Sequence, residues 1–316
     1  MLIYGDSIAY GYGASHKSKD FAGLLINQGL NISRQGSLPN NPSSRPGNMS
    51  CDLGYAMYGN LIHDGTILQV GTNDVIVKGI SYLSNYISSI SALIVWSCCR
   101  CKRPQYDSGF DLAGSWSGNN YWPGSPGKYT YQQNASVRFT AIGKSIYLGS
   151  YIENNITGSF LVKVDGQDYG RYTCGDSNLT TAHGQTYAPK LITLRNLSEG
   201  IHNIEMILDD YSGNNPVMYL DFVSSSDESL WNPFYVLEIP KQITYYPPYG
   251  NLALEVYNDV LKALCNNFWN DSLNVQFCTV NLKDSDFMVG QNNGDNLHPN
   301  DSGYYKMFHS LYRLIK

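Results

Sequence analysis

A serine near the start of the chain and a histidine near its end carry the clearest chemistry in this sequence. Ser7 lies in Gly5-Asp6-Ser7, directly after the apolar run Leu2-Ile3-Tyr4, and His298 lies in Asp295-Asn296-Leu297-His298-Pro299. A serine hydroxyl is a weak nucleophile at neutral pH, so it needs a base within hydrogen-bond reach and a third group that orients the base. Ser7, His298 and Asp295 supply these three chemistries. Because they stand at opposite ends of the chain, only the fold can bring them together.

The segments that must position these residues alternate between strands and helices. We expect strands at 1–4, 66–70, 234–239 and 275–280. We expect helices at 17–30, 50–62, 80–101, 251–268 and 300–315, each from apolar residues that recur at helical spacing. Strands that alternate with helices favour a parallel sheet covered by helices on both faces.

The middle of the chain has a different character. From Pro104 to about Asp227 it is dense in Gly, Tyr, Ser and Asn, and Asp165-Gly166 is a strong hairpin-turn signal. We expect short strands at 136–139, 144–149, 159–165, 190–194, 202–208 and 217–223. This predicts an antiparallel β-sandwich or jelly roll at 104–228, inserted into a discontinuous α/β domain of residues 1–103 and 229–316.

Three polar residues follow the ends of predicted strands. Ser7 follows the first strand, Asn73 in Gly71-Thr72-Asn73-Asp74 follows the second, and His298 lies in the loop after the last. Open α/β sheets build their sites at the carboxyl ends of the strands. Each motif alone is weak, since turns often use Gly, Asp and Ser and since the residues around 295–300 could simply cap a helix. Together, and in this order, they predict one site.

These three blocks together resemble the SGNH (GDSL-like) hydrolase family, over residues 1–103 and 229–316. The resemblance implies a three-layer α/β/α hydrolase that needs no cofactor or metal. In it Ser7 would be the nucleophile, and His298 would act first as general base and then as general acid. Asp295 would hold the imidazole in the required tautomer and stabilise its charged form.

The same resemblance implies an oxyanion hole with three donors. These would be the backbone N–H of Ser7, the side chain of Asn73 and the backbone N–H of a glycine. Gly47, in Arg45-Pro46-Gly47-Asn48, is the preferred glycine because it precedes a predicted helix at a family-like distance from Asn73. Gly36 is the alternative.

The insert is similar to carbohydrate-binding jelly-roll modules over 134–149, 158–166 and 200–205. Trp116, Tyr121 and Trp122 crowd its start, and such side chains either stack on sugars or pack in cores. An SGNH core with this kind of insert resembles esterase domains of bacteriophage tail spikes and fibres, which remove O-acetyl groups from bacterial surface polysaccharides. That resemblance implies an acetylated polysaccharide as partner, a location in the virion tail after synthesis in the host cytoplasm, and a homo-oligomer, a trimer if tail-spike derived.

The composition of the chain argues against several other classes of protein. The 316 residues carry a net charge of −5, which argues against a nucleic-acid partner because such surfaces are usually basic. The sequence has no apolar run long enough to span a membrane, so we expect no membrane insertion. The seven scattered cysteines predict free thiols, and Cys98-Cys99-Arg100-Cys101 lacks a second cluster at zinc-site spacing. Because the first strand begins almost at Met1, a longer natural chain is expected.

The expected function is a serine esterase that removes O-acetyl groups from a polysaccharide through an acyl-enzyme on Ser7, with a bacterial surface glycan as the expected substrate. One alternative is the same machinery acting on lipid or acyl-thioester substrates, which predicts good turnover of long-chain esters. The other is a non-catalytic glycan-binding module, which predicts glycan binding without esterase activity. The identity of the polysaccharide and the role of the insert in sugar or calcium binding stay open at this point.

Overall fold

The protein is described from a computed structural model. The described residues are 1–34, 47–58, 64–122, 125–177, 179, 187–212, 215–241, 250–288 and 297–316.

A four-stranded parallel sheet forms the centre of the α/β part. Its order is β1 (Leu2–Gly5), β2 (Thr66–Gln69), β14 (Phe234–Leu237) and β15 (Val275–Cys278). Nearly every side chain in these strands is buried, because the strands are apolar on both faces. Successive side chains point to opposite faces, so Leu2 and Ile3 join different hydrophobic clusters. This parallel α/β core is the predicted fold class.

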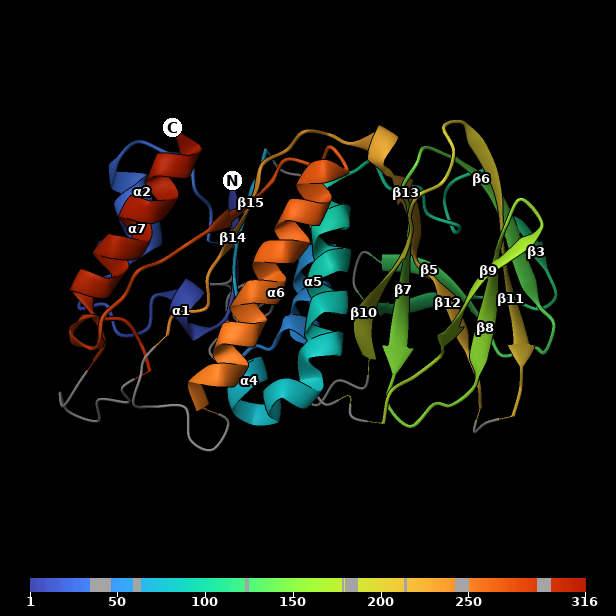
Figure 1. The fold of residues 1–316 in the computed structure, drawn as a ribbon, viewed down its shortest axis with the longest axis horizontal. Coiled ribbons are helices and arrows are strands. Elements are labelled where there is room, and N and C mark those ends of the chain that lie inside the picture. Colours follow the sequence, from blue (N-terminus) through green and yellow to red (C-terminus); the bar gives the residue numbers. More distant parts are fainter. Residues whose placement is uncertain are drawn as a thin grey trace.

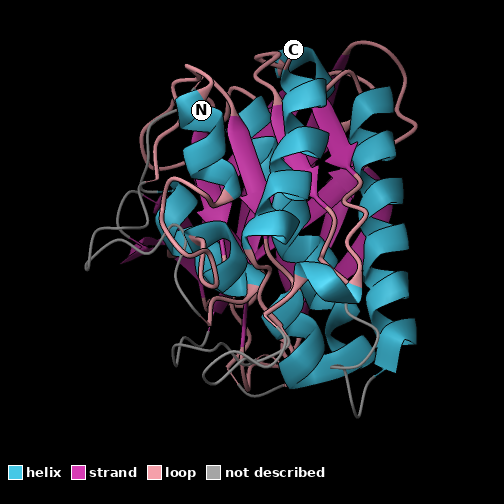
Figure 2. Cartoon of the chain, turned by 90° about the vertical axis from the view of Figure 1, so that its left-hand side faces the viewer, coloured by secondary structure: helices cyan, strands magenta, loops and turns pink. Residues whose placement is uncertain are grey.

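Helices cover both faces of this sheet. One face carries α1 (Ser7–Tyr10), α2 (Phe21–Asn27) and α7 (Asp301–Ile315). The other carries α3 (Leu53–Tyr58), α4 (Thr72–Lys78), α5 (Leu83–Cys98) and α6 (Gly250–Asn270). Figure 1 shows α2 and α7 on one side of β14 and β15 and the pair α5 and α6 on the other. Figure 2, seen from the side of α2 and α7, shows the sheet behind the helices.

The antiparallel strands all lie between α5 and β14 in the sequence. One sheet has the order β3 (Asp111–Ala113), β6 (Ser136–Ile142), β11 (Ile201–Asp210), β8 (Ser159–Val164) and β9 (Gln167–Thr173). A second has the order β10 (Tyr187–Leu194), β7 (Ile146–Glu153) and β13 (Phe222–Ser225). A third has the order β12 (Met218–Leu220), β5 (Ser125–Thr130) and β4 (Ser117–Trp122). The inserted β-sandwich is therefore present, while its predicted boundaries at 104 and 228 stay a prediction.

The sandwich packs directly on the helical layer. In β7, Ile146 and Leu148 point into the sandwich core, whereas Tyr147 and Tyr151 belong to the cluster that contains α5 and α6. Tyr147 lies with its ring centroid 5.9 Å from that of Phe268 on α6. Because β7 is apolar on both faces, the insert is anchored to the α/β core through a continuous buried cluster. Figure 1 shows β10 and β7 next to α5.

Two predicted helices are shorter in the structure. The helix predicted at 17–30 is confined to α2, because the Asp20 side chain caps it by accepting a hydrogen bond from Gly23 N at 2.8 Å. The helix predicted at 80–101 begins with the 3₁₀ turn Gly79–Tyr82 and ends at Cys98. Cys99 is extended and bridges to Ser229, so it cannot continue the helix.

The prediction of one strand at 217–223 is wrong. The segment forms β12, which pairs with β5, and β13, which pairs with β7. The break falls at the buried Asp221, whose side chain accepts a hydrogen bond from Tyr151 Oη at 3.3 Å. The predicted hairpin turn is confirmed, since Asp165 and Gly166 have φ of 52° and 79° between the paired residues Val164 and Gln167.

The cysteines are free, as predicted. None of the helices within the described ranges has the length and apolar character needed to cross a bilayer.

Candidate active site

Ser7 stands where β1 turns into α1. The chain passes very close to β2 here, since a Cβ on Gly5 would lie 1.8 Å from Gln69 O, and Gly5 has φ of 156°. Asp6 is the N-cap of α1, and its Oδ1 accepts a hydrogen bond from Ile8 N at 2.9 Å. Ser7 is therefore the first residue of a capped helical turn at the carboxyl end of β1, with its side chain almost fully buried.

His298 meets Ser7 from the other end of the chain. Its Nε2 lies 2.6 Å from Ser7 Oγ, although 291 residues separate the two. The backbone of His298 is held by a hydrogen bond from Met288 N to His298 O at 3.0 Å. Pro299 bridges to Phe287 in an antiparallel arrangement. The base is thus presented by a paired segment rather than by a free loop.

Helix α7 connects this segment to the serine turn. Tyr304, fully buried on α7, donates its hydroxyl towards two carbonyls, Ile8 O at 3.1 Å and Tyr12 O at 2.7 Å. The N-cap of α7, Asn300, lies two residues after His298 and accepts hydrogen bonds from Ser302 N and Gly303 N. One helix therefore places the base and also restrains the turn that carries the nucleophile.

The exposed aromatic ring of Tyr12 lies beside His298. Its ring centroid is 4.5 Å from that of His298, and 52% of the side chain is exposed. Its backbone N donates to Ser7 O at 2.9 Å. Gly13, with φ of 95°, allows this close approach, because a Cβ there would lie 2.6 Å from Pro299 O.

Asn73 is positioned by the segment that contains Gly47. Its Nδ2 donates to Asn48 O at 2.9 Å, and Asn48 Nδ2 donates in turn to Gly5 O at 3.0 Å. An amide NH₂ group has two hydrogens, so the bond to Asn48 uses one and leaves the second for another acceptor. Gly47, in the left-handed region with φ of 87°, directly precedes Asn48. Asn48 therefore joins the serine turn, the glycine segment and Asn73.

Two buried carboxyl groups support this arrangement. Asp74 accepts hydrogen bonds from Ser50 Oγ at 2.6 Å and from Ser50 N at 3.0 Å, which ties α4 to the segment after Gly47. Burial raises the pKa of Asp74 to about 7. Burial likewise raises the pKa of Asp6 to about 7, against the lowering effect of its bond from Ile8 N. Through these hydrogen bonds, Asp6 holds the backbone of Ile8 in position and Asp74 holds that of Ser50.

The structure places the predicted residues as follows. Ser7 and His298 are in contact, and Asn73 and Gly47 are linked through Asn48 to the strand end that carries Ser7. Asp295 and the alternative glycine, Gly36, lie outside the described residues. The roles assigned to all of them stay predictions.

The sequence reasoning missed Asn48, Tyr12 and Tyr304. Asn48 carried a signal, since it adjoins Gly47, but an asparagine in a loop is ordinary. Tyr304 was predicted only as part of the apolar face of the last helix, and nothing local indicates that its hydroxyl reaches the serine turn. Trp116 packs against the sandwich core with its Nε1 donating to Ala113 O at 3.0 Å. The structure describes the backbone of Tyr121 and Trp122 in β4 but not their side chains.

The chemistry available here is proton transfer to and from a serine. A distance of 2.6 Å allows direct transfer between Ser7 Oγ and a neutral imidazole. Asn73 Nδ2 and backbone N–H groups are donors of the kind that stabilise a developing oxyanion. Within the described part of the chain, no group of three or more His, Cys, Asp or Glu side chains could hold a metal ion.

Comparisons with known proteins give structural likenesses only. No protein-family model matches the sequence. No curated protein matches it. The chain is similar to a two-domain esterase active on acetylated mannans, crystallised with mannopentaose, at 12% identity, covering 71% of this chain and 89% of that one, with a TM-score of 0.40.

Carbohydrate-binding modules also match part of the chain. One is the CBM36-1 domain of a multidomain xylanase from the hindgut metagenome of Trinervitermes trinervoides, at 19% identity over 37% of this chain and 88% of that one, with a TM-score of 0.27. Another is a CBM36 module in complex with calcium and xylotriose, at 13% identity over 40% of this chain and 98% of that one, with a TM-score of 0.29. Because these TM-scores are low, the activity of this chain has to be inferred from its own residues.

Proposed function

We propose that the protein is a serine esterase that hydrolyses its substrate through an acyl-enzyme on Ser7. The observation that carries the proposal is the 2.6 Å contact between Ser7 Oγ and His298 Nε2 at the carboxyl end of a parallel sheet. The serine is capped and nearly buried, and the histidine backbone is held by pairing with the segment before it. Such restraint of a nucleophile and its base is what covalent catalysis requires.

The reaction follows from these positions. Ser7 Oγ attacks the ester carbonyl carbon while its proton passes to His298 Nε2. The negative charge on the carbonyl oxygen is stabilised by Ser7 N–H, by the second hydrogen of Asn73 Nδ2 and by Gly47 N–H. His298 then gives its proton to the leaving alcohol, and a water molecule, activated by the same imidazole, releases the acid and restores Ser7. Asp295 orients the imidazole throughout.

The proposed substrate is an O-acetyl group on a polysaccharide. Two features support this choice. The inserted β-sandwich is similar in sequence to carbohydrate-binding jelly-roll modules. The exposed ring of Tyr12 lies next to His298, where a sugar that bears the ester could lie against it. A bacterial surface glycan as the source of the ester, a virion-tail location and a trimer are the finer parts of the proposal.

The test is hydrolysis of p-nitrophenyl esters of increasing acyl length, with wild type beside Ser7→Ala. Acetate release from a panel of acetylated polysaccharides, acetylated mannan among them, follows with the same pair of proteins. We expect turnover that is highest for acetyl and absent in the variant. Equal turnover by Ser7→Ala would exclude the acyl-enzyme, and glycan binding without any turnover would favour a non-catalytic module.

One observation favours a second candidate, an esterase or thioesterase for longer acyl chains. A cavity of about 340 Å³ adjoins Tyr10, at the opposite end of α1 from Ser7, and Ile26 and Gly23 also line it. The same cavity is bordered by Lys17 and Arg34, which makes it a poor match for a purely apolar chain. Activity that peaks at long acyl chains would favour this candidate over deacetylation.

A further inference from the structure

A polar groove lies where the β-sandwich meets the end of α6. We call it the junction groove; it has a volume of about 780 Å³, and Lys144, Arg195, Glu199, Asp227 and Asn270 are among its lining residues. Helix α6 follows β14 and runs back past the sheet, so its last residue is near the start of β15 rather than near Ser7. Its 21 residues span about 31 Å, so the groove at its end lies far from the serine. Figure 1 shows α1, which begins at Ser7, near the other end of α6.

The floor of the junction groove is held together by hydrogen bonds to one carboxylate. Asp271, just after α6, accepts hydrogen bonds from Ser145 Oγ at 2.9 Å and Tyr147 Oη at 2.9 Å. It also accepts bonds from Arg195 Nε at 3.1 Å and Nη2 at 2.9 Å. Four bonds from the insert therefore converge on one carboxylate of the α/β core. A site held this firmly loses little conformational freedom when a ligand binds.

Most of the charged side chains in the junction groove form ion pairs with one another. Lys144 Nζ lies 2.6 Å from Glu199 Oε1, and Arg195 is bound to Asp271. With Asp227 added, the lining has two cationic and three carboxylate side chains, a net charge of −1 that disfavours an acidic ligand. The lining also presents guanidinium, carboxylate and amide groups at a wide opening, and such groups exchange hydrogen bonds with hydroxyl groups. A neutral ligand rich in hydroxyls fits this lining.

Two exposed tryptophans lie on segments that border the groove. Trp269 is 50% exposed and directly precedes Asn270, which lines the groove. Trp231 is 61% exposed and has φ of 55°, a conformation that is rare for a bulky side chain and costs backbone energy. Single exposed aromatics are common, but these two lie on joined segments, since Asn274 Nδ2 donates to Trp231 O at 3.2 Å and Ser229 Oγ to Ser272 O at 3.2 Å.

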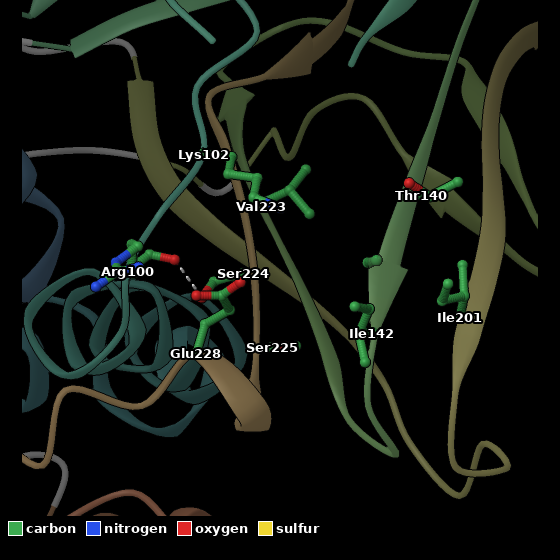
Figure 3. Close-up of a pocket in the computed structure, with 10 residues that line it drawn as sticks. Arg100, Lys102, Thr140, Ile142, Ile201, Val223, Ser224, Ser225 and Glu228 are labelled. Atoms are coloured by element: carbon green, nitrogen blue, oxygen red, sulfur yellow. Dashed lines mark hydrogen bonds between the residues drawn. The ribbon is translucent and has the colours of Figure 1, made fainter. Parts of the chain in front are cut away.

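A smaller cavity lies next to the junction groove. It has a volume of about 90 Å³ and lies on the other side of the turn at Ser226–Glu228, between the strand ends that carry Ile142 and Ile201 and the segment at Arg100 (Figure 3). Ile142 and Ile201 are 51% and 67% exposed. The polar lining of the groove can exchange hydrogen bonds with the hydroxyl groups of a sugar. The exposed tryptophan rings and the exposed side chains of Ile142 and Ile201 can contact its C–H faces.

We infer that the junction groove, with Trp231 and Trp269 at its side, is a second, non-catalytic binding site for a neutral polysaccharide. The site lies too far from Ser7 to touch the reacting ester. It would hold a distant part of the same long polymer, and so raise the local concentration of esters at the catalytic edge. Its sugar binding does not depend on esterase activity.

The test is binding of the Ser7→Ala protein, which leaves acetyl groups intact, to an array of neutral and acidic polysaccharides. We expect binding to neutral glycans that falls by roughly tenfold or more in Trp231→Ala/Trp269→Ala, as removal of aromatic anchors does. The matched control is Tyr305→Ala, which removes an aromatic ring of similar exposure, 52%, from α7 and should leave binding unchanged. Lys144→Ala, in the groove wall, gives a second variant whose folding is safe because 62% of its side chain is exposed.

Three results would overturn the inference. One is an array with no neutral glycan bound, and another is binding that the tryptophan pair and Lys144→Ala leave unchanged. The third comes from sedimentation: an oligomer that dissociates in the tryptophan variant would make this face a subunit interface. Because the array uses a catalytically inactive protein, loss of the proposed esterase activity and loss of this binding site are separate outcomes.

Discussion

Tyr304→Phe tests whether α7 holds the serine turn in place. The variant removes only a buried hydroxyl that points to Ile8 O at 3.1 Å and Tyr12 O at 2.7 Å, and phenylalanine fills the same space. Leaving a buried acceptor without its donor costs about 1–3 kcal/mol. For a chain of this size each kcal/mol lowers Tm by about 2 °C, so we expect a drop of roughly 2–6 °C. Because the ring itself is kept, the substitution opens no large cavity, and lost packing adds little to this cost.

Catalysis should suffer as well as stability. Tyr12 packs on His298 and bonds to Ser7 O, so a small drift of this turn changes the geometry between nucleophile and base. We expect kcat on p-nitrophenyl acetate to fall by roughly tenfold with little change in KM, because no substrate-binding group is removed. Calorimetry and steady-state kinetics measure the two effects. Tyr305→Phe on the same helix is the control, since that ring is exposed. If the two variants behave alike, the proposed restraint by Tyr304 is refuted.

Four further changes probe the site. Asn73→Ala should lower kcat by roughly 10²–10³, as loss of one oxyanion donor does. It should also lower Tm by roughly 2–6 °C, because the buried Asn48 O loses its bond from Asn73 Nδ2. A KM effect alone would contradict the oxyanion role. Tyr12→Ala should lower kcat/KM on acetylated polysaccharide more than on p-nitrophenyl acetate, and equal losses would remove it from sugar contact. Asp295→Asn should lower the rate strongly without unfolding the protein, as circular dichroism would check. The raised pKa values of Asp6 and Asp74, both about 7, mean that the folded state binds more protons than the unfolded chain. The free energy of unfolding should therefore fall as pH rises from about 4 to about 8, and Asp74→Asn should flatten that fall in urea titrations at several pH values.

The parts of the fold that could be predicted are those with a strong local pattern. The parallel strands are short apolar runs that end at glycine or polar residues, and the long helices have clear apolar faces. The strands β4 and β5 were missed because Gly, Asn, Ser and Pro dominate them, and such residues signal turns. The segment around Asp221 looks like one strand, since nothing local shows that its two halves pair with different sheets.

The residues of the candidate site also divide into those that a local pattern predicts and those that it does not. Ser7, His298 and Asn73 are recognisable because their residue types and their order along the chain suit one chemistry, and a strand end is a local feature. Gly47 could only be preferred over Gly36, because the choice depends on where a loop lies. The structure brings the Gly47 segment to Gly5 through the side chain of Asn48, a contact across 43 residues.

By itself, the sequence determined the chemical groups, their order and the alternation of strands and helices, all of which are properties of short segments. Only the tertiary structure decided that Ser7 Oγ and His298 Nε2 lie 2.6 Å apart, that Tyr304 reaches the serine turn, and that the insert packs on α5 and α6. The physical reason is that these contacts join residues far apart in the chain. Their energies depend on burial and on distances of a few tenths of an ångström, which no local pattern records.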